Sequence, residues 1–201
     1  MPAIQRAILS CYDKTGIVDL ASLLIEFGVE IISTSGTLRV LRDAGIEATS
    51  IEDFTGVPEL MGGRVKSLHP KVHAGLLGLR DNKLHSEQMQ SYEMEWVDML
   101  VVNMQPLSSL IAQPGITTEE VFNQTDIGGV AMLRSVAKNF RYVTCVVKPE
   151  RYASVMHELR AHDGEMTFAT RYRLAQEAFT LTADYDRSIA DFLRETEPPV
   201  A

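Results

Sequence analysis

The amino-acid sequence predicts an α/β fold in three layers: a mostly parallel sheet between flanking helices, with further helices at the C-terminus. Along roughly the first three quarters of the 201 residues, short strands that are apolar on both faces alternate with helices. Such strands are typical of a parallel sheet that is covered on both sides. From Pro149 onward the pattern is helical. We expect one domain over residues 1–201, with an α/β core over 1–148 and C-terminal helices over 149–194.

Each element is predicted from apolar spacing and from the residues that end it. The apolar runs predict strands over 7–12, 29–34, 46–51, 97–103 and 142–147. Helical spacing predicts helices over 17–27, 38–44, 84–94, 130–138 and, interrupted near Asp163, 149–194. Thr117 and Glu120 have the spacing of a capping box. Segment 71–80 fits no single element, and the last residues from 195 are expected to fray.

Composition excludes several classes of protein. A formal net charge of −8 without a broad basic stripe argues against nonspecific nucleic-acid binding. No apolar run has the length needed to cross a bilayer, and the N-terminus does not have the pattern of a signal peptide. The two cysteines, Cys11 and Cys145, lie in predicted buried strands, which fits unpaired thiols in a reducing compartment. We therefore expect a cytoplasmic protein with no membrane or nucleic-acid partner.

Segment 61–70 concentrates side chains that can bind anions or transfer protons. It places Arg64, Lys66, Ser67 and His69 within six residues, after two glycines and before a proline. The whole chain has only six lysines. Cations beside flexible glycines in an otherwise acidic protein indicate an anion-binding and proton-transfer site.

Polar residues also follow three predicted strands directly. Ligands of open α/β sheets bind beyond the carboxyl ends of the strands, so these residues should share one rim. Hydroxyl groups and free N–H groups at a helix start hold phosphate well. The strand-end residues are Ser10, Lys14, Thr34, Ser35, Gly36, Thr37 and Asn103. For Thr37 the alternative is a helix cap, and for Lys14 it is a solvated turn.

Asp126 and Lys138 are a candidate acid/base pair, because a carboxylate close to an ammonium group can poise it for proton transfer. The alternative is that Asp126 caps a helix and Lys138 lies near its C-terminal dipole. His69 and His73 have a spacing found in metal sites, but no cysteine or carboxylate lies nearby in the sequence. We expect no metal.

Together these motifs resemble the IMP cyclohydrolase domain of the bifunctional purine biosynthesis family. The resemblance covers nearly the whole chain, and its specificity lies in the combination of motifs. They are Ser10-x-x-Asp13-Lys14-Thr15-Gly16, Ser33-Thr34-x-Gly36-Thr37, Gly63-Arg64-Val65-Lys66-x-Leu68-His69-Pro70, Asp126-Ile127-Gly128-Gly129 and Ala137-Lys138-Asn139. The resemblance implies a methylglyoxal-synthase-like fold and closure of the purine ring of inosine monophosphate, without metal or organic cofactor.

The resemblance also implies residue roles. Lys66, Asp126 and Lys138 would be catalytic. The purine ribonucleotide substrate would be bound by Ser10, Lys14, Thr34, Ser35, Gly36, Thr37, Arg64, Ser67, Asn103, Gln105, Ile127, Gly128 and Gly129.

The chain departs from the family pattern in several respects, among them Ser67 in place of a threonine. Gln105 stands where the family has a tyrosine that is thought to take part in proton transfer, and an amide cannot titrate. Ser35 replaces a glycine, and Leu181 stands where a histidine is common. The family's formyltransferase domain has no counterpart, so a separately encoded formyltransferase partner stays open, as does a homodimer.

Other functions on the same fold remain as alternatives. A purine-nucleotide-binding or regulatory module would need the phosphate contacts but no acid/base residues. A methylglyoxal synthase would need a carboxylate base near the phosphate turns, where Asp13 is the one obvious candidate.

Overall fold

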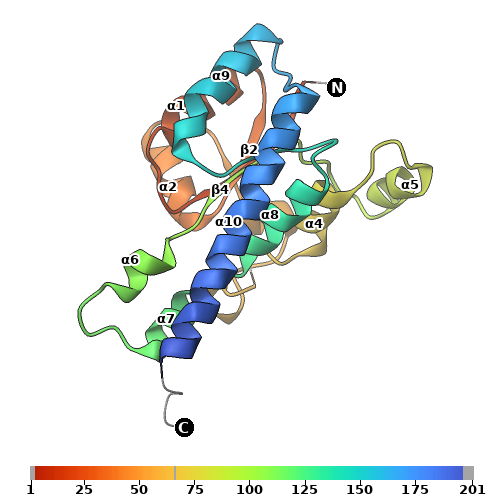
Figure 1. Cartoon of the computed structure of the whole chain (residues 1–201). Coiled ribbons are helices and arrows are strands. Elements are labelled where there is room, and N and C mark those ends of the chain that lie inside the picture. Colours follow the sequence, from red (N-terminus) through yellow and green to blue (C-terminus); the bar gives the residue numbers. More distant parts are fainter. Residues whose placement is uncertain (1–2, 66, 197–201) are drawn as a thin grey trace.

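A computed structural model describes residues 3–65 and 67–196 of the chain (Figure 1). In this part of the chain the strands form one sheet in the order β3-β2-β1-β4-β5, and every neighbouring pair is parallel. The strands are β1 (Arg6–Cys11), β2 (Glu30–Ser33), β3 (Thr49–Ser50), β4 (Met99–Asn103) and β5 (Thr144–Val146). The predicted α/β class with a parallel sheet is therefore confirmed.

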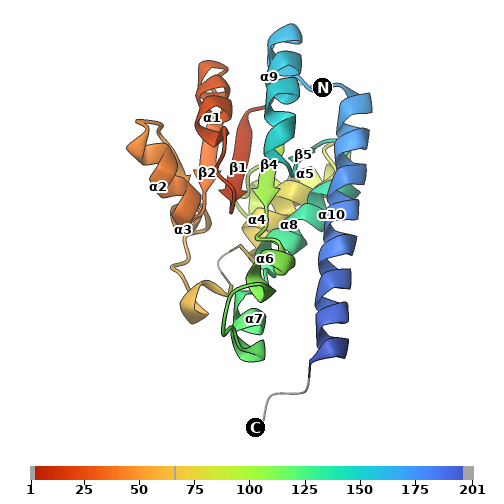
Figure 2. The same cartoon turned by 60° about the vertical axis from the view of Figure 1, so that its left-hand side comes forward.

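Helices cover both faces of the sheet (Figure 2). One face packs against α1 (Ile17–Glu26), α2 (Ser35–Asp43) and α9 (Tyr152–Ala161). The other packs against α3 (Ile51–Thr55), α4 (Pro70–Leu77), α8 (Gly128–Lys138) and α10 (Phe168–Glu195). The remaining elements are η1 (Met61–Gly63), α5 (Lys83–Ser91), α6 (Leu107–Ile111), α7 (Thr118–Gln124) and η2 (Pro149–Arg151).

The strands divide their side chains between the two layers because successive residues of a strand point to opposite faces. In β1, Ala7 and Leu9 pack with the first group of helices, whereas Ile8 packs with the second. All three side chains are fully buried. This explains why the strands are continuously apolar in sequence.

The third strand is the clearest departure from prediction. The apolar run at 46–51 predicts six residues, but β3 contains only Thr49 and Ser50. The Ser50 side chain accepts a hydrogen bond from the Asp53 backbone N–H, which starts α3 directly at Ile51. The cap therefore ends the strand one residue before its predicted end, whereas residues 46–48 precede β3 without strand pairing.

Two further segments become helical. The ambiguous segment 71–80 forms most of α4, which His69 caps by accepting from the Lys71 N–H. Helix α2 begins at Ser35, before the predicted helix start at residue 38. The capping box of Thr117 with Glu120 is confirmed.

The C-terminal helices flank the sheet. The predicted break lies between α9 and α10, where Asp163 and Gly164 have positive φ values. Helix α10 has 28 residues and runs along α8 and β5 (Figure 1). None of the helices in the described ranges combines the length and apolarity that a membrane crossing requires. Residues 197–201, which belong to the expected frayed tail, lie outside the described residues.

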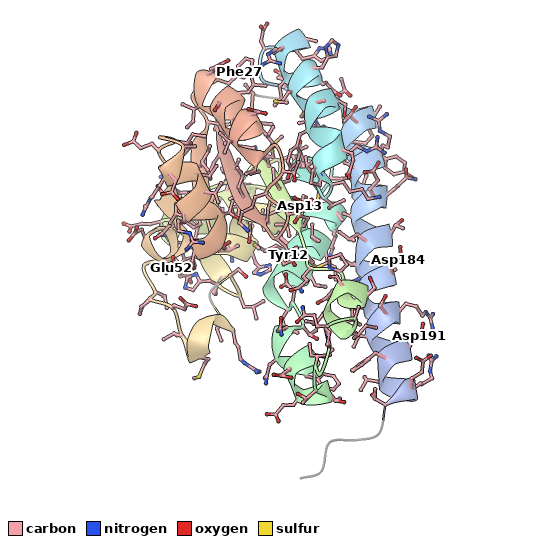
Figure 3. All side chains as sticks on the ribbon, turned by 90° about the vertical axis from the view of Figure 1, so that its left-hand side faces the viewer. Tyr12, Asp13, Phe27, Glu52, Asp184 and Asp191 are labelled. Atoms are coloured by element: carbon pink, nitrogen blue, oxygen red, sulfur yellow. The ribbon has the colours of Figure 1, made fainter. Side chains whose placement is uncertain are left out.

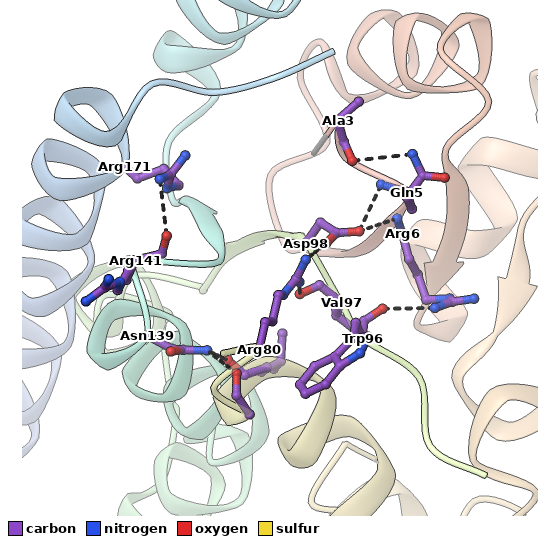
Figure 4. Close-up of polar contacts among 12 residues, drawn as sticks. Ala3, Gln5, Arg6, Arg80, Trp96, Val97, Asp98, Asn139, Arg141 and Arg171 are labelled. Carbon is purple, nitrogen blue, oxygen red and sulfur yellow. Dashed lines mark hydrogen bonds and ion pairs between the residues drawn. The ribbon is translucent and has the colours of Figure 1, made fainter. Parts of the chain in front are cut away.

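At the amino end of the strands, a buried carboxylate joins β1 to β4 (Figure 4). Asp98 Oδ2 accepts from the backbone N–H groups of Gln5 and Arg6 at 2.8 and 2.9 Å. Its Oδ1 lies 2.6 Å from Nη1 of Arg80, whose guanidinium stacks over Trp96. The chain's own donors thus saturate Asp98.

Candidate functional site

A cleft of about 650 Å³ opens at the carboxyl end of β1, β2 and β4. Figure 3 labels Tyr12 and Asp13, which follow β1 at this end. Strands β1 and β4 are neighbours, but the chain leaves them toward opposite sides of the sheet, so the cleft lies at a topological switch point. Its volume is within the range of small-molecule sites.

The cleft collects nearly all of the predicted binding residues. Of the described residues predicted to bind substrate, all except the exposed Ser35 line it. They are Ser10, Lys14, Thr34, Gly36, Thr37, Arg64, Ser67, Asn103, Gln105, Ile127, Gly128 and Gly129. Asp126 lines it too. Lys66 lies outside the described residues.

Hydroxyl groups connect β1 to the start of α2. The hydroxyls of Ser10 and Thr34 lie 2.7 Å apart. The Thr37 hydroxyl accepts from the Cys11 N–H at 2.8 Å and donates to the Cys11 carbonyl at 3.1 Å, so it does not cap the helix. Among the described residues, the N-cap residue of α2, Thr34, makes no side-chain hydrogen bond to the helix. The first N–H groups of this nine-residue helix are therefore available to an anion, next to Gly36.

Lys14 and Asn103 complete this side of the cleft. Lys14 Nζ donates to the Tyr12 carbonyl at 3.0 Å, and its side chain passes close to Gly36. The Asn103 side-chain amide holds the segment that follows β1 with two hydrogen bonds. It accepts from the Asp13 N–H at 2.7 Å and donates to the Asp13 carbonyl at 2.9 Å. Hydrogen bonds from Thr15 lower the pKa of Asp13, so this exposed carboxylate is charged at neutral pH.

The loop that carries Arg64 enters the cleft through an unusual turn. Met61, Gly62 and Gly63 have φ values of 52°, 62° and 87°, a conformation that favours glycine. This explains the two glycines of the motif. Beyond them, Arg64 Nη2 donates to Oδ1 of Asn123, close to the end of α7.

Ser67 packs against the start of α8. It is almost fully buried, and a Cβ atom built on Gly128 would overlap its hydroxyl oxygen. A side chain at position 128 would therefore have to displace the Ser67 hydroxyl.

Asp126 is held at both its backbone and its side chain. Its Oδ1 accepts from the Gly129 N–H at 2.8 Å in the first turn of α8. Its own N–H donates to the hydroxyl of Tyr185 at 2.8 Å. Burial raises the pKa of Tyr185, which keeps that phenol neutral. A charged carboxylate is favourable at a helix start.

The prediction that Asp126 and Lys138 lie close together is wrong. Asp126 precedes α8, and Lys138 is its last residue. At 1.5 Å per residue, the eleven residues of this helix separate the two ends by about 15 Å. Lys138 is exposed and does not line the cleft. The structure agrees with the alternative interpretation. The Asp126 side chain caps the start of α8, and Lys138 lies in its last turn.

The two histidines of the loop have structural contacts. His69 caps α4, and His73 Nδ1 lies 3.0 Å from the Ser135 hydroxyl. Burial lowers the pKa of His73. Within residues 3–65 and 67–196, no three His, Cys, Asp or Glu side chains form a group that could hold a metal ion.

Two side chains that hydrogen-bond to predicted site residues were not themselves predicted. Tyr185 reaches Asp126 from α10, and Asn123 meets Arg64 from α7. Neither residue follows a strand, so the strand-end argument could not find them. Tyr185 is 59 residues from Asp126 in sequence, and only the packing of α10 brings the two together.

Two family models match the chain. The model described as MGS-like domain matches residues 16–131. The model described as AICARFT/IMPCHase bienzyme matches residues 136–200.

Similar proteins include several called bifunctional purine biosynthesis protein PurH. The one from Magnetococcus marinus is 48% identical and matches 96% of this chain. Those from Chlorobium chlorochromatii and Chloroflexus aurantiacus are each 50% identical, over 96% and 97% of the chain. The match covers only 36%, 37% and 38% of these three proteins, so the chain spans little more than a third of their length.

A solved structure shows the same fold over nearly all of this chain. The crystal structure of ForH superposes with a TM-score of 0.84 at 35% identity. The match covers 95% of this chain and 100% of ForH.

Proposed function

The chain belongs to the MGS-like domain family, and we propose that it is an IMP cyclohydrolase of de novo purine biosynthesis. The single observation that carries the proposal is the cleft at the switch point, where an uncapped helix start and cationic side chains face a fixed carboxylate. The similarity to proteins named PurH and the match to the AICARFT/IMPCHase model support the choice of reaction.

The proposed substrate is 5-formamidoimidazole-4-carboxamide ribonucleotide. Its carboxamide nitrogen attacks the neighbouring formyl carbon, which forms a C–N bond and closes the six-membered ring. One proton from the carboxamide nitrogen and one from the formamido nitrogen leave with the formyl oxygen as water. Because the reaction is intramolecular, holding the two groups in an attack geometry supplies much of the rate.

In this proposal one side of the cleft binds the phosphate of the substrate and the other side binds its base. The 5′-phosphate binds at the start of α2, near Lys14 and Gly36. Thr37 and Ser10 shape this subsite, and Arg64 adds a second cation from the loop. The base lies toward Asn103, Ile127 and Gly128. No metal or organic cofactor takes part.

We assign proton transfer at the carboxamide nitrogen to Asp126. Its carboxylate is held in one orientation by the Gly129 N–H, as a proton acceptor in an intramolecular reaction requires. Lys66 is assigned to the formyl oxygen, on the motif alone, where it would stabilise the developing charge. Lys138 has no direct part, because it is exposed at the far end of α8.

Gln105 lines the cleft at the position of the family's tyrosine. An amide can orient the substrate but cannot transfer a proton. We propose that the remaining groups suffice for turnover. A large rise in kcat for Gln105→Tyr, by orders of magnitude, would contradict a fully competent enzyme.

We propose that residues 1–201 act as one domain, because α9 and α10 contribute to the same two cores as the strands. Both cysteines are buried and unpaired, which favours the cytoplasm. A formyltransferase, encoded separately or in the same chain, would supply the substrate, and a homodimer is the proposed assembly.

The test is turnover of the formylated carboxamide ribonucleotide, followed by ultraviolet absorbance, with Lys66→Ala as control. We expect turnover that the substitution abolishes. No turnover, with inosine monophosphate still binding in a titration, would favour the second candidate, a purine-nucleotide-binding module. That candidate is favoured by Gln105, which cannot titrate, and by the distance of Lys138 from the cleft.

A further inference from the structure

Tyr185 is a buried phenol that the ring-closure scheme does not use. It is 7% exposed and lines the cleft from α10. Its hydroxyl oxygen accepts the Asp126 N–H at 2.8 Å. Burial raises the pKa of this phenol, and the neighbouring carboxylates of Asp126 and Asp186 raise it further. The group is therefore a neutral hydrogen-bond donor at the pH of metabolism.

The proton of this hydroxyl has no acceptor among residues 3–65 and 67–196. Within these ranges the hydroxyl oxygen makes one hydrogen bond, which it accepts from the Asp126 backbone. A phenol can accept and donate at the same time. Because a buried donor without a partner is costly, a ligand acceptor in the cleft would satisfy it.

We propose that Tyr185 is a further substrate-binding residue that donates a hydrogen bond to the carboxamide oxygen of the bound nucleotide. This inference rests on the proposed function. As Asp126 takes a proton from the carboxamide nitrogen, negative charge spreads onto the neighbouring carboxamide oxygen. A neutral donor fixed beside Asp126 stabilises that charge without transferring its own proton. The same oxygen persists as the ring carbonyl of inosine monophosphate, so the product also accepts from Tyr185.

Tyr185 has a second, separable effect as a positioning residue. Its oxygen fixes the Asp126 backbone, while the Gly129 N–H fixes the Asp126 carboxylate. Removing the hydroxyl would therefore act on the substrate directly and also through Asp126. An experiment must distinguish these two routes.

The experiment compares Tyr185→Phe with Tyr142→Phe in the full chain. Tyr142 is a matched control because it is also buried, at 9% exposure, but it does not line the cleft. We expect kcat to fall about 100-fold in Tyr185→Phe. The affinity for inosine monophosphate should fall about 10-fold, the loss of one good hydrogen bond. Tyr142→Phe should change neither, and thermal unfolding should confirm that both variants are folded.

A double variant separates direct donation from positioning. Asp126→Asn retains an oxygen that can accept from the Gly129 N–H but removes the base. If Tyr185 donates to the ligand, adding Tyr185→Phe to Asp126→Asn weakens nucleotide binding by the same factor as in the wild type. No further loss in the double variant would overturn direct donation.

The outcomes distinguish this inference from the proposed function. Unchanged turnover and unchanged nucleotide affinity in Tyr185→Phe would overturn the inference and leave the cyclohydrolase standing. A wild type that binds the nucleotide without turning over would refute the proposed function. Weaker binding in Tyr185→Phe alone would then still support Tyr185 as a ligand contact. A wild type that does not bind inosine monophosphate would overturn both.

Discussion

Carboxylates and backbone N–H groups lie at both ends of the parallel strands, but their hydrogen bonding differs between the two ends. At the amino end, Asp98 is saturated by two backbone N–H groups and by Arg80. At the carboxyl end, Asp126 caps a helix beside a cleft, and the start of α2 has no side-chain cap. A buried carboxylate that the chain itself saturates holds the fold together. A carboxylate that lines an open cleft, as Asp126 does together with the start of α2, lies where a ligand can bind.

The largest effects are expected when each of the two carboxylates is replaced by the isosteric amide. For Asp126→Asn we expect kcat for ring closure to fall about 100- to 10,000-fold, because a general base is lost. The melting temperature should stay close to that of the wild type, since an amide oxygen can still accept from the Gly129 N–H. Steady-state kinetics and thermal unfolding measure the two effects. Wild-type activity in Asp126→Asn would remove Asp126 from the mechanism.

The matched change at the other end, Asp98→Asn, should do the reverse. It leaves Arg80 without its charge partner in a buried site, and breaking such a pair costs about 3–5 kcal/mol of unfolding free energy. Turnover per folded molecule should be unchanged. Urea unfolding followed by kinetics at low denaturant tests this. An equal loss of kcat per folded molecule would show that the two ends are coupled.

Much of this arrangement could be predicted from sequence. Parallel strands bring their carboxyl ends to one edge of the sheet. Polar residues at the ends of β1, β2 and β4 were therefore expected to lie close together. Ser10, Thr34 and Asn103 do so. This rule depends only on strand polarity and not on exact boundaries, and it therefore survives the shortening of β3.

Features set by helix length and helix packing were not predictable in this way. Asp126 and Lys138 lie near each other in the sequence. In the structure, α8 holds them at its opposite ends. Tyr185 reaches the cleft because α10 packs along α8, a tertiary contact with no local signal. The Ser50 cap that ends β3 and starts α3 was a local signal that the apolar run obscured.

A smaller effect should come from filling the space beside Ser67. Gly128→Ala places a methyl group where the Ser67 hydroxyl lies, and such overpacking should weaken nucleotide binding about 10-fold. The next atom of Ser67, its Cβ, would be 3.5 Å away, an ordinary contact. In a Ser67→Ala background the same glycine substitution should therefore cost almost nothing. Titration of the four proteins with inosine monophosphate checks this, and additive losses would refute the steric account.

The smallest expected effect concerns His73, which packs behind the Arg64 loop. Burial lowers its pKa below the ordinary value of 6.5. As pH falls through 6.5, the unfolded chain binds the proton first, so the folded state loses stability below that pH and not above it. Thermal unfolding at pH 7.5 and 5.5 should show a larger drop for the wild type than for His73→Gln. Equal drops would exclude this contribution.

The comparison of the two ends is tested most directly by mapping where inosine monophosphate binds. Backbone amide resonances of the full chain would be followed by NMR during a titration with the nucleotide. We predict large shifts for Gly36, Asp126 and Gly128 at the carboxyl end of the sheet, and none for Gln5, Arg6 and Asp98 at the amino end. Shifts concentrated at the amino end, or saturation without any shift at Gly36 and Gly128, would contradict the assignment of the cleft as the nucleotide site.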